Sequence, residues 1–366
     1  MPILDQPWVQ AANVAGQNRV YVGFNDLGAP NANTAYVAVS NTGGTSFQAA
    51  VALDNAAVGQ DNPAVRVAVQ GNEVYAAFER RTAAPGATTV AGDIVVARDD
   101  NGGIKSTANP NPFQALGAGG VVADSGTLAR PSFLLGQERL GSDLSIAIDP
   151  TDKTGMSVYL AYGKIVGGQA ESFLEKSADG GATWKAFGPG PILNAGLPAI
   201  AVAADGSVGL LYTELVKTSM DTEFLKLSST GVGGPPVDLA IWPQNTPAMT
   251  FTPYIGDYQQ LVAVGNNFYG AFSASDDPSL ANWANPALNV IFQRQVLGTL
   301  GTPGAMLGNG TGGAGPAVSI DPYYFTTASV PEPATLTMAL IGVGAGLAWQ
   351  LVRRRARRSS ATPAGV

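Results

Sequence analysis

The chain has 366 residues, a net charge of −7 and only 13% charged residues, and it contains neither cysteine nor histidine. It therefore cannot use a Cys nucleophile, a Ser-His-Asp triad, a thiolate or imidazole metal site, or a haem held by histidine. Its acidic residues are dispersed, so we expect no nucleic-acid partner, which would need a clustered basic surface. A metal would need oxygen ligands, and proton transfer would fall to Asp, Glu, Tyr or Lys.

A three-strand unit recurs along the chain, and the 46 Gly and 25 Pro suit the tight turns between such strands. The first strand of each unit is apolar and is predicted at residues 8–12, 64–69, 144–148, 199–203 and 260–264. The second carries Val-Tyr-x-x-Phe or a variant, at residues 20–24, 74–78, 158–162, 208–212 and 268–272. The third is predicted at residues 35–40, 93–98, 172–176, 223–227 and 289–293.

The repeat predicts an all-β fold, a β-propeller over residues 1–297. Antiparallel units spaced by roughly 50 residues are typical of propeller blades. The interval between the second and third units is longer and contains residues 102–129, which we interpret either as a decorated loop or as a degenerate blade. Counting an extra blade, here or before residue 1, we expect six blades.

The N-terminus shows no export signal. Residues 1–8 have neither a basic region nor an apolar run. Because the C-terminal features described next require export, we hypothesise that translation starts upstream of Met1 and supplies a signal peptide, with room for one more blade. The genomic sequence upstream of Met1 tests this, since an in-frame stop directly before it would contradict the hypothesis.

The C-terminal region differs from the repeats. Residues 298–329 are predicted as a Gly-rich linker, in which 318–325 read as a strand that closes the ring. Residues 334–352 form an uncharged apolar run long enough for one transmembrane helix. The arginines that follow indicate that this end stays cytoplasmic and that everything before residue 330 lies outside; they are Arg353, Arg354, Arg355, Arg357 and Arg358. Residues 359–366 are expected to be a disordered tail.

Residues 330–358 resemble the PEP-CTERM sorting signal of Gram-negative bacteria that make extracellular polysaccharide. The resemblance rests on Pro331, Glu332 and Pro333, the apolar span and the arginines. It implies that exosortase, a membrane peptidase, recognises the tail and cuts near the Pro-Glu-Pro segment. The protein would then be anchored in the inner membrane before processing and released to the cell surface or the extracellular matrix.

The turn after residue 176 resembles the Asp-box of sialidases and related BNR-repeat propellers. It carries Ser177, Asp179, Gly181, Thr183 and Trp184, and a degenerate copy with Thr in place of Asp lies at 40–47. An Asp side chain can bind backbone N–H groups of its own turn, and glycine permits a positive φ. In this family the box lies on the outer turns, so the resemblance implies a structural role.

Sialidases grip the substrate carboxylate with three arginines and use an Asp acid/base and a Tyr activated by Glu. The Arg-Ile-Pro motif that introduces the first arginine is absent here, because Arg130 is followed directly by Pro131. Arg66, Arg80, Arg81, Arg130, Arg139 and Arg294 show no spacing that singles out three, and we interpret them as surface residues. No catalytic residue is therefore assigned.

An aspartate precedes the first strand in four of the units, and these are Asp5, Asp61, Asp143 and Asp257. If the first strands are innermost, the four carboxylates would surround one mouth of the central channel, where they could bind a ligand or a cation such as calcium. The alternative is that aspartate is simply a good turn residue ahead of a strand. No other cofactor and no dedicated metal site is expected.

Together these features predict an exported cell-surface or matrix propeller that binds carbohydrate, such as extracellular polysaccharide, or another surface component without catalysis. Two alternatives stay open. One is a sialidase-type glycoside hydrolase that works through Asp, Glu and Tyr, and the other is a passive structural protein of the matrix.

Overall fold

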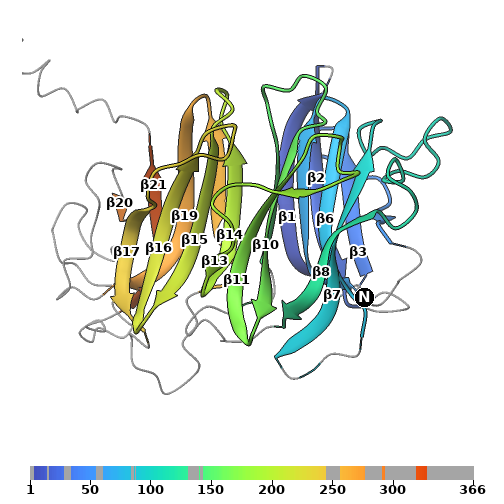
Figure 1. Cartoon of the computed structure of the whole chain (residues 1–366). Helices are drawn as coiled ribbons and strands as arrows, with labels where there is room; N and C mark the ends of the chain where they lie inside the picture. The colour runs from blue at the N-terminus through green and yellow to red at the C-terminus, as the bar shows by residue number, and fades with distance from the viewer. Residues whose placement is uncertain are drawn as a thin grey trace, which may run out of the picture. The chain divides into compact units, whose positions relative to one another are not determined.

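The computed structural model describes residues 4–14, 16–28, 34–54, 61–83, 86, 88–130, 140, 143–244, 256–276, 291–292 and 319–327. At 61–64, 276, 291–292 and 319–321 only the backbone is described. The chain divides into two compact units, Met1–Thr327 and Ala328–Val366, and all described residues belong to the first. This unit is all-β and consists of five sheets that form the blades of a propeller (Figure 1).

Each blade is an antiparallel sheet whose strands follow one another outward from the channel, with one exception in the last blade. Blade 1 contains β1 (Leu4–Val14), β2 (Gln17–Asp26), β3 (Thr34–Ser40) and β4 (Val51–Ala52). Blade 2 contains β5 (Asp61–Gln70), β6 (Glu73–Arg81), β7 (Thr89–Asp99) and β8 (Val121–Ala129). Blade 3 contains β9 (Leu144–Ile148), β10 (Val158–Val166), β11 (Gln169–Ser177), β12 (Lys185–Ala186) and β13 (Ile192–Leu193).

Blades 4 and 5 complete the described unit. Blade 4 contains β14 (Ala195–Val202), β15 (Val208–Val216), β16 (Ser219–Leu227) and β17 (Val237–Pro243). Blade 5 contains β18 (Gln260–Val264), β19 (Asn267–Asp276), β21 (Ser319–Thr326) and β20 (Ile291–Phe292), in this order from the inside outward. The predicted first and second strands of all five units are confirmed as neighbouring antiparallel pairs.

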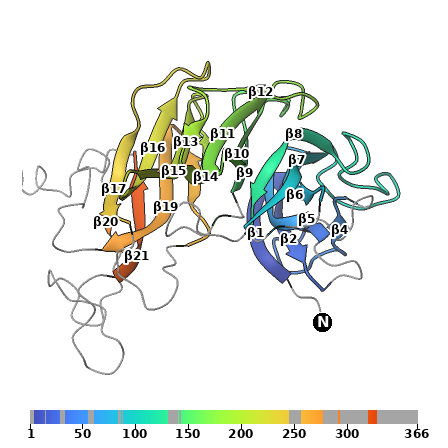
Figure 2. The same ribbon diagram turned by 60° about the horizontal axis from the view of Figure 1, so that its bottom comes forward.

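The first strand of every unit is the innermost one, and these strands come together around a central channel (Figure 2). The channel holds a cavity of about 630 Å³, which is lined by residues of β1, β5, β9, β14 and β18. Apolar side chains of these strands pack between blades, as β14 shows, where all eight residues are buried. The continuous apolar pattern of β14 follows from a neighbouring blade on each face, whereas β1 and β18 keep several residues exposed.

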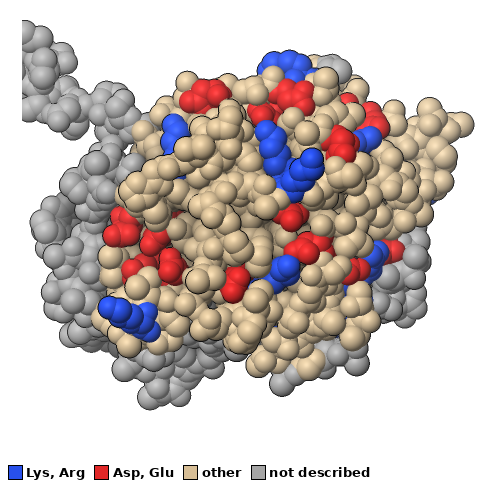
Figure 3. All heavy atoms as spheres, in the orientation of Figure 1, with Lys and Arg blue, Asp and Glu red and all other residues tan. Residues whose placement is uncertain are grey.

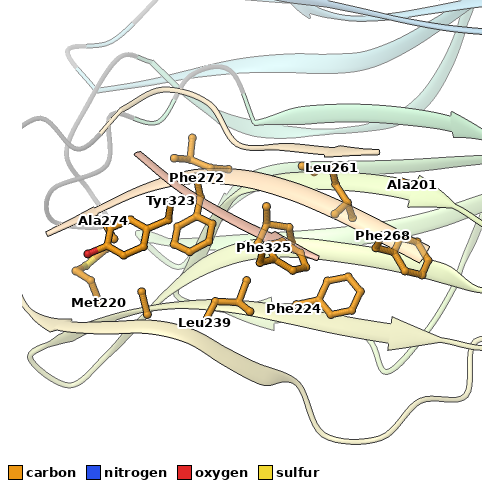
Figure 4. Close-up of a cluster of buried hydrophobic side chains, with 14 of the residues drawn as sticks. Ala201, Met220, Phe224, Leu239, Leu261, Phe268, Phe272, Ala274, Tyr323 and Phe325 are labelled. Atoms are coloured by element: carbon orange, nitrogen blue, oxygen red, sulfur yellow. The ribbon is translucent and has the colours of Figure 1, made fainter. Parts of the chain in front are cut away.

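The interface between blades 4 and 5 shows how the blades are held together. Phe224 of β16 packs against Phe268 of β19 and Phe325 of β21, with ring centroids 5.4 and 5.1 Å apart. Leu239, Leu261 and Phe272 surround these rings (Figure 4). Burial of such aromatic and aliphatic side chains is the main source of stability between neighbouring sheets.

The tyrosine of the repeated Val-Tyr motif links one blade to the next. The hydroxyl of Tyr21 donates to the Gly102 carbonyl at 3.2 Å, and that of Tyr75 donates to the Gly155 carbonyl at 2.8 Å. Both rings are fully buried, and burial raises the pKa of Tyr75 to about 12. In blades 1 and 2 the motif therefore places a buried ring and one hydrogen bond at the boundary with the following blade.

The described residues form five blades, and the sixth blade that we expected is not shown. The long interval between the second and third units does not contain a blade of its own. Residues 121–129 in this interval are the outer strand β8 of blade 2, which pairs with β7 from Thr89↔Ala129 onward. Residues 100–120 form the loop that leads to it. The decorated-loop interpretation is thus correct, and the degenerate-blade interpretation is wrong.

The last blade also differs from the prediction. The strand expected to close the ring, residues 318–325, is β21, which pairs with β19 and takes the third position of blade 5. The strand predicted third, residues 289–293, contributes only β20, which lies outside β21. Among the residues that the structure describes, no helix is long and apolar enough to cross a membrane. The predicted helix 334–352, most of the linker and the tail lie outside these residues and stay predictions.

Candidate functional site

The Asp-box turn of blade 3 is closed by its own side chains. Ser177 Oγ accepts from the Asp179 and Gly181 backbone N–H groups at 3.3 and 2.8 Å, and Asp179 Oδ1 accepts from Thr183 N at 2.9 Å. The Thr183 hydroxyl donates to Asp179 Oδ2 at 2.6 Å, and these bonds lower the pKa of Asp179 to about 2. Trp184 Nε1 donates to the Gly181 carbonyl at 3.1 Å. All acceptors are used within the turn, which favours a structural role.

Three other blades carry related turns. The blade 1 turn is a degenerate Asp-box, and the turns of blades 2 and 4 lack the Asp-box sequence. In blade 1, Ser40 Oγ accepts from Gly44 N at 2.9 Å and Thr42 Oγ1 accepts from Ser46 N at 2.9 Å, so Thr42 replaces the aspartate. In blade 4, Ser228 Oγ accepts from Val232 N at 3.2 Å. In blade 2, Asp99 occupies the serine position and accepts from Gly103 N at 2.6 Å. Of these three turns, the sequence predicted the one in blade 1, at residues 40–47, and missed the one in blade 4.

Of the four aspartates predicted to surround a channel mouth, Asp143 and Asp257 precede their innermost strands, whereas Asp5 lies within β1 and Asp61 is the first residue of β5. Their surroundings also differ. Asp143 and Asp257 are buried, with 3% and 4% of their surface exposed, and Asp5 is half-buried. The Asp61 side chain lies outside the described part. Asp143 Oδ1 accepts from the Leu197 N–H at 2.8 Å. No group of three acidic side chains suited to hold a metal occurs in the described part of the chain, so calcium binding stays a prediction.

A bulge brings polar residues to the same mouth. The β1–β2 register shifts between Asp5 and Trp8, and Gln6 adopts a φ of 50° directly before Pro7. Blade 4 repeats this arrangement at Leu197, which has a φ of 55°. A non-glycine residue at positive φ costs about 1–3 kcal/mol and is concentrated at functional sites. In both blades the X-Pro dipeptide lies within the innermost strand, at the register shift, and sequence reasoning did not connect it with a bulge.

A groove with a volume of about 610 Å³ lies between the first and the last blade. One wall comes from β1 and the bulge within it, and the other comes from β18, β19, β21 and the residues just before β18. Its lining contains three aromatic residues, three glutamines and no acidic or basic residue; the residues are Gln6, Pro7, Trp8, Val9, Tyr258, Gln259, Gln260, Ala271, Phe272, Ser273 and Pro322.

Arg66 contacts two of the three aromatic residues of this groove. Its guanidinium lies over the Trp8 ring of blade 1, 4.5 Å from the ring centroid, and 5.7 Å from the centroid of Tyr258 in blade 5. Its Nε donates to the Leu144 carbonyl of blade 3 at 3.0 Å. Only 3% of Arg66 is exposed, so interpreting it as a surface residue was wrong. Burial lowers the pKa of Arg66 to about 10, and the side chain remains charged at neutral pH.

The Gln259 amide is held by blade 4. Its Nε2 donates to Thr213 Oγ1, which in turn shares a hydrogen bond with Thr222 at 3.0 Å. Its Oε1 is buried and has no partner among the described residues, and only 7% of Gln259 is exposed. A buried acceptor without a partner costs about 1–3 kcal/mol.

The tyrosine–carboxylate pairs and the arginines that sialidase chemistry would need do not have the arrangement of a reactive site. Tyr162 donates to Asp124 at 2.6 Å, and Tyr212 hydrogen-bonds to Glu223. Burial and the adjacent carboxylates raise the pKa of both tyrosines, which opposes activation of a nucleophile. Arg80 binds Asp54 and Asp93 at 2.9 and 3.0 Å, whereas Arg139 and Arg294 lie outside the described residues.

Acidic side chains gather on one face of blade 4 (Figure 3). Asp221 pairs in register with Glu214, and Glu223 pairs with Tyr212 and Asp238. Burial raises the pKa of Glu214, Glu223 and Asp221, with Asp221 reaching about 6, and the neighbouring carboxylates add to the shift of Asp221. This face therefore becomes less stable as its carboxyl groups lose their protons.

The variant Asp221→Asn should raise the stability of the protein at neutral pH but not at acid pH. A raised folded-state pKa means that the contribution of Asp221 is present below pH 4 and is lost as the pH rises through about 6. The shift corresponds to about 3 kcal/mol without solvent and, after screening, to about 1 kcal/mol. Urea unfolding of both proteins at pH 4.5 and 7.5 measures it. An equal difference at the two pH values would contradict the assignment.

Comparison with known families explains the C-terminal residues. Residues 329–358 match the PEP-CTERM protein-sorting motif, the recognition signal for exosortase. The motif implies export and a location at the cell surface. The resemblance of this segment is thereby confirmed, and its exosortase partner is supported.

Comparison with solved structures concerns the propeller alone. Trypanosoma rangeli sialidase is 16% identical, with a TM-score of 0.41 over 72% of this chain and 43% of the sialidase. An α-L-arabinanase of Penicillium chrysogenum is 9% identical, with a TM-score of 0.43 over 72% and 74%. An exo-β-1,3-galactanase of Phanerochaete chrysosporium is 14% identical, with a TM-score of 0.39 over 72% of this chain and 55% of the galactanase.

The chain spans less than half of the sialidase and just over half of the galactanase. It has no match among curated protein sequences. The function must therefore be argued from the groove itself.

Proposed function

We propose that this is an exported surface protein whose propeller binds a saccharide in the groove between blades 1 and 5. The observation that carries the proposal is the combination of Trp8 and Tyr258 with three glutamine side chains in one hollow. The C–H faces of a sugar ring can lie on aromatic rings, while amide groups donate to and accept from its hydroxyls. A mostly apolar hollow with a few fixed polar groups is typical of ligand sites.

Three features of the groove favour binding of a ligand. Arg66 holds Trp8 and Tyr258 from opposite sides of the groove, so their rings need little reordering on binding. The positive φ of Gln6 stores strain at the same place, and Gln259 Oε1 lacks a partner. A site that is ordered in advance loses less entropy when it binds.

Binding of soluble polysaccharides by the full-length protein, measured by isothermal titration, tests the proposal. We expect Trp8→Ala and Tyr258→Ala to weaken binding at least tenfold, because each removes one aromatic surface. Phe47→Ala is the matched control, since Phe47 is as exposed as Tyr258, at 45% against 43%, and lies outside the groove. Equal losses in the control, or no polysaccharide binding at all, would contradict the proposal.

Glycosidase assays on the same purified protein distinguish saccharide binding from hydrolysis. The raised pKa of Tyr162 and Tyr212 leads us to expect no turnover of fluorogenic sialosides or other glycosides. Turnover that Tyr162→Phe or Tyr212→Phe abolishes would favour the hydrolase instead. Absence of both binding and turnover would favour a passive matrix protein.

A further inference from the structure

The charges around the groove point to the class of saccharide, an inference that rests on the proposed function. The lining itself has no acidic or basic side chain. A carboxylate precedes the lining residues on each side, Asp5 before Gln6 and Asp257 before Tyr258. Asp257 is buried, with 4% of its surface exposed, so the half-buried Asp5 is the carboxylate of the two that a saccharide could approach.

The one cation at the groove does not offset these carboxylates. Arg66 lies against the faces of Trp8 and Tyr258 and donates to the Leu144 carbonyl. The buried carboxylates of Glu79 and Asp143 act on it electrostatically. Its charge is thus already compensated inside the protein, and 97% of its surface is covered, so it is poorly placed to grip a carboxylate or sulfate of a ligand.

We propose that the groove binds a neutral polysaccharide, built of uncharged hexose or pentose units, and discriminates against polymers that carry uronate or sulfate groups. Uncharged hydroxyls suit Gln6, Gln259 and Gln260, whose amides donate and accept without fixed charge. An anionic unit would lose water in a groove whose described lining holds no cation, close to the half-buried Asp5. The net charge of −7 adds to this repulsion.

The test compares polymers that differ only in charge. The full-length protein is titrated with neutral β-1,3-glucan, mannan, galactan and arabinan, and then with the carboxymethyl derivative of each polymer that binds. Alginate and polygalacturonate serve as natural acidic polymers. We expect the carboxymethyl derivative to bind at least tenfold more weakly at 50 mM salt, and the ratio of the two dissociation constants to shrink at 500 mM salt.

A charge variant isolates the cause of the discrimination. Asp5→Asn should reduce the ratio of dissociation constants between the carboxymethyl and neutral forms severalfold, and its melting temperature shows whether the fold is kept. Acidic polymers that bind as tightly as neutral ones would overturn this inference and leave saccharide binding intact. Failure of every polymer, neutral and acidic, would overturn the proposed function as well.

Discussion

Replacing Asp99 by Ala is expected to lower the free energy of unfolding by about 3–5 kcal/mol, because one buried carboxylate organises the whole loop from β7 to β8. Asp99 Oδ1 accepts from Asn101 N and Gly103 N at 2.8 and 2.6 Å. Its Oδ2 accepts from Asn109 Nδ2 and Phe113 N at 2.8 and 3.2 Å. The variant leaves three backbone N–H groups without this acceptor, and each costs about 1–3 kcal/mol where water cannot reach.

The effect should spread beyond the turn. Phe113 is fully buried and packs in the core that blades 1 and 2 share, so loss of its backbone anchor also loosens that core. Guanidinium unfolding monitored by circular dichroism measures the change. Asp100→Ala is the matched control, since Asp100 is exposed and only forms an ion pair with Arg98, worth less than about 1 kcal/mol. Equal losses for the two variants would contradict this role of Asp99.

The features that could be predicted from sequence are those made by neighbouring residues. A blade is built from hairpins, so the Val-Tyr motif and the apolar strand before it lie close in sequence and in space. The Asp-box turn closes within residues 177–184 for the same reason. Their patterns are local, and a local pattern survives in a single sequence.

The features that sequence reasoning missed depend on distant segments. The groove joins residues 6–9 to residues 258–273, and β21 enters blade 5 after a long intervening segment. Arg66 looked like any other arginine, because nothing near it in sequence indicates Trp8, Tyr258 or Leu144. Asp143 and Asp257 lie ahead of their strands as predicted, but Asp5 and Asp61 lie within β1 and β5, and Asp143 accepts a hydrogen bond from Leu197 of the next blade. These contacts join different blades, so no single stretch of the sequence reveals them.

Arg66→Met is expected to destabilise the propeller by about 3–5 kcal/mol, the usual result when one member of a buried charge group is removed. The methionine fills a similar volume but leaves the buried carboxylates of Glu79 and Asp143 without their cation. It also removes the planar group between Trp8 and Tyr258. Arg66→Lys should lose less, because it keeps the charge while it gives up the flat guanidinium.

Hydrogen exchange distinguishes a general loss of stability from the loss of a specific link. Arg66 belongs to blade 2 and contacts the first, third and last blades, so β1 and β18 should exchange faster in Arg66→Met while β15 and β16 change little. Arg130→Met is the control, since Arg130 donates a single hydrogen bond to the Gly86 carbonyl within its own blade. Uniform acceleration in all five blades would mean that Arg66 supports the fold without joining the first blade to the last. Acceleration confined to β1 and β18 would show that one buried cation keeps the ring closed at the groove, which is why saccharide binding and ring stability should be lost together in this variant.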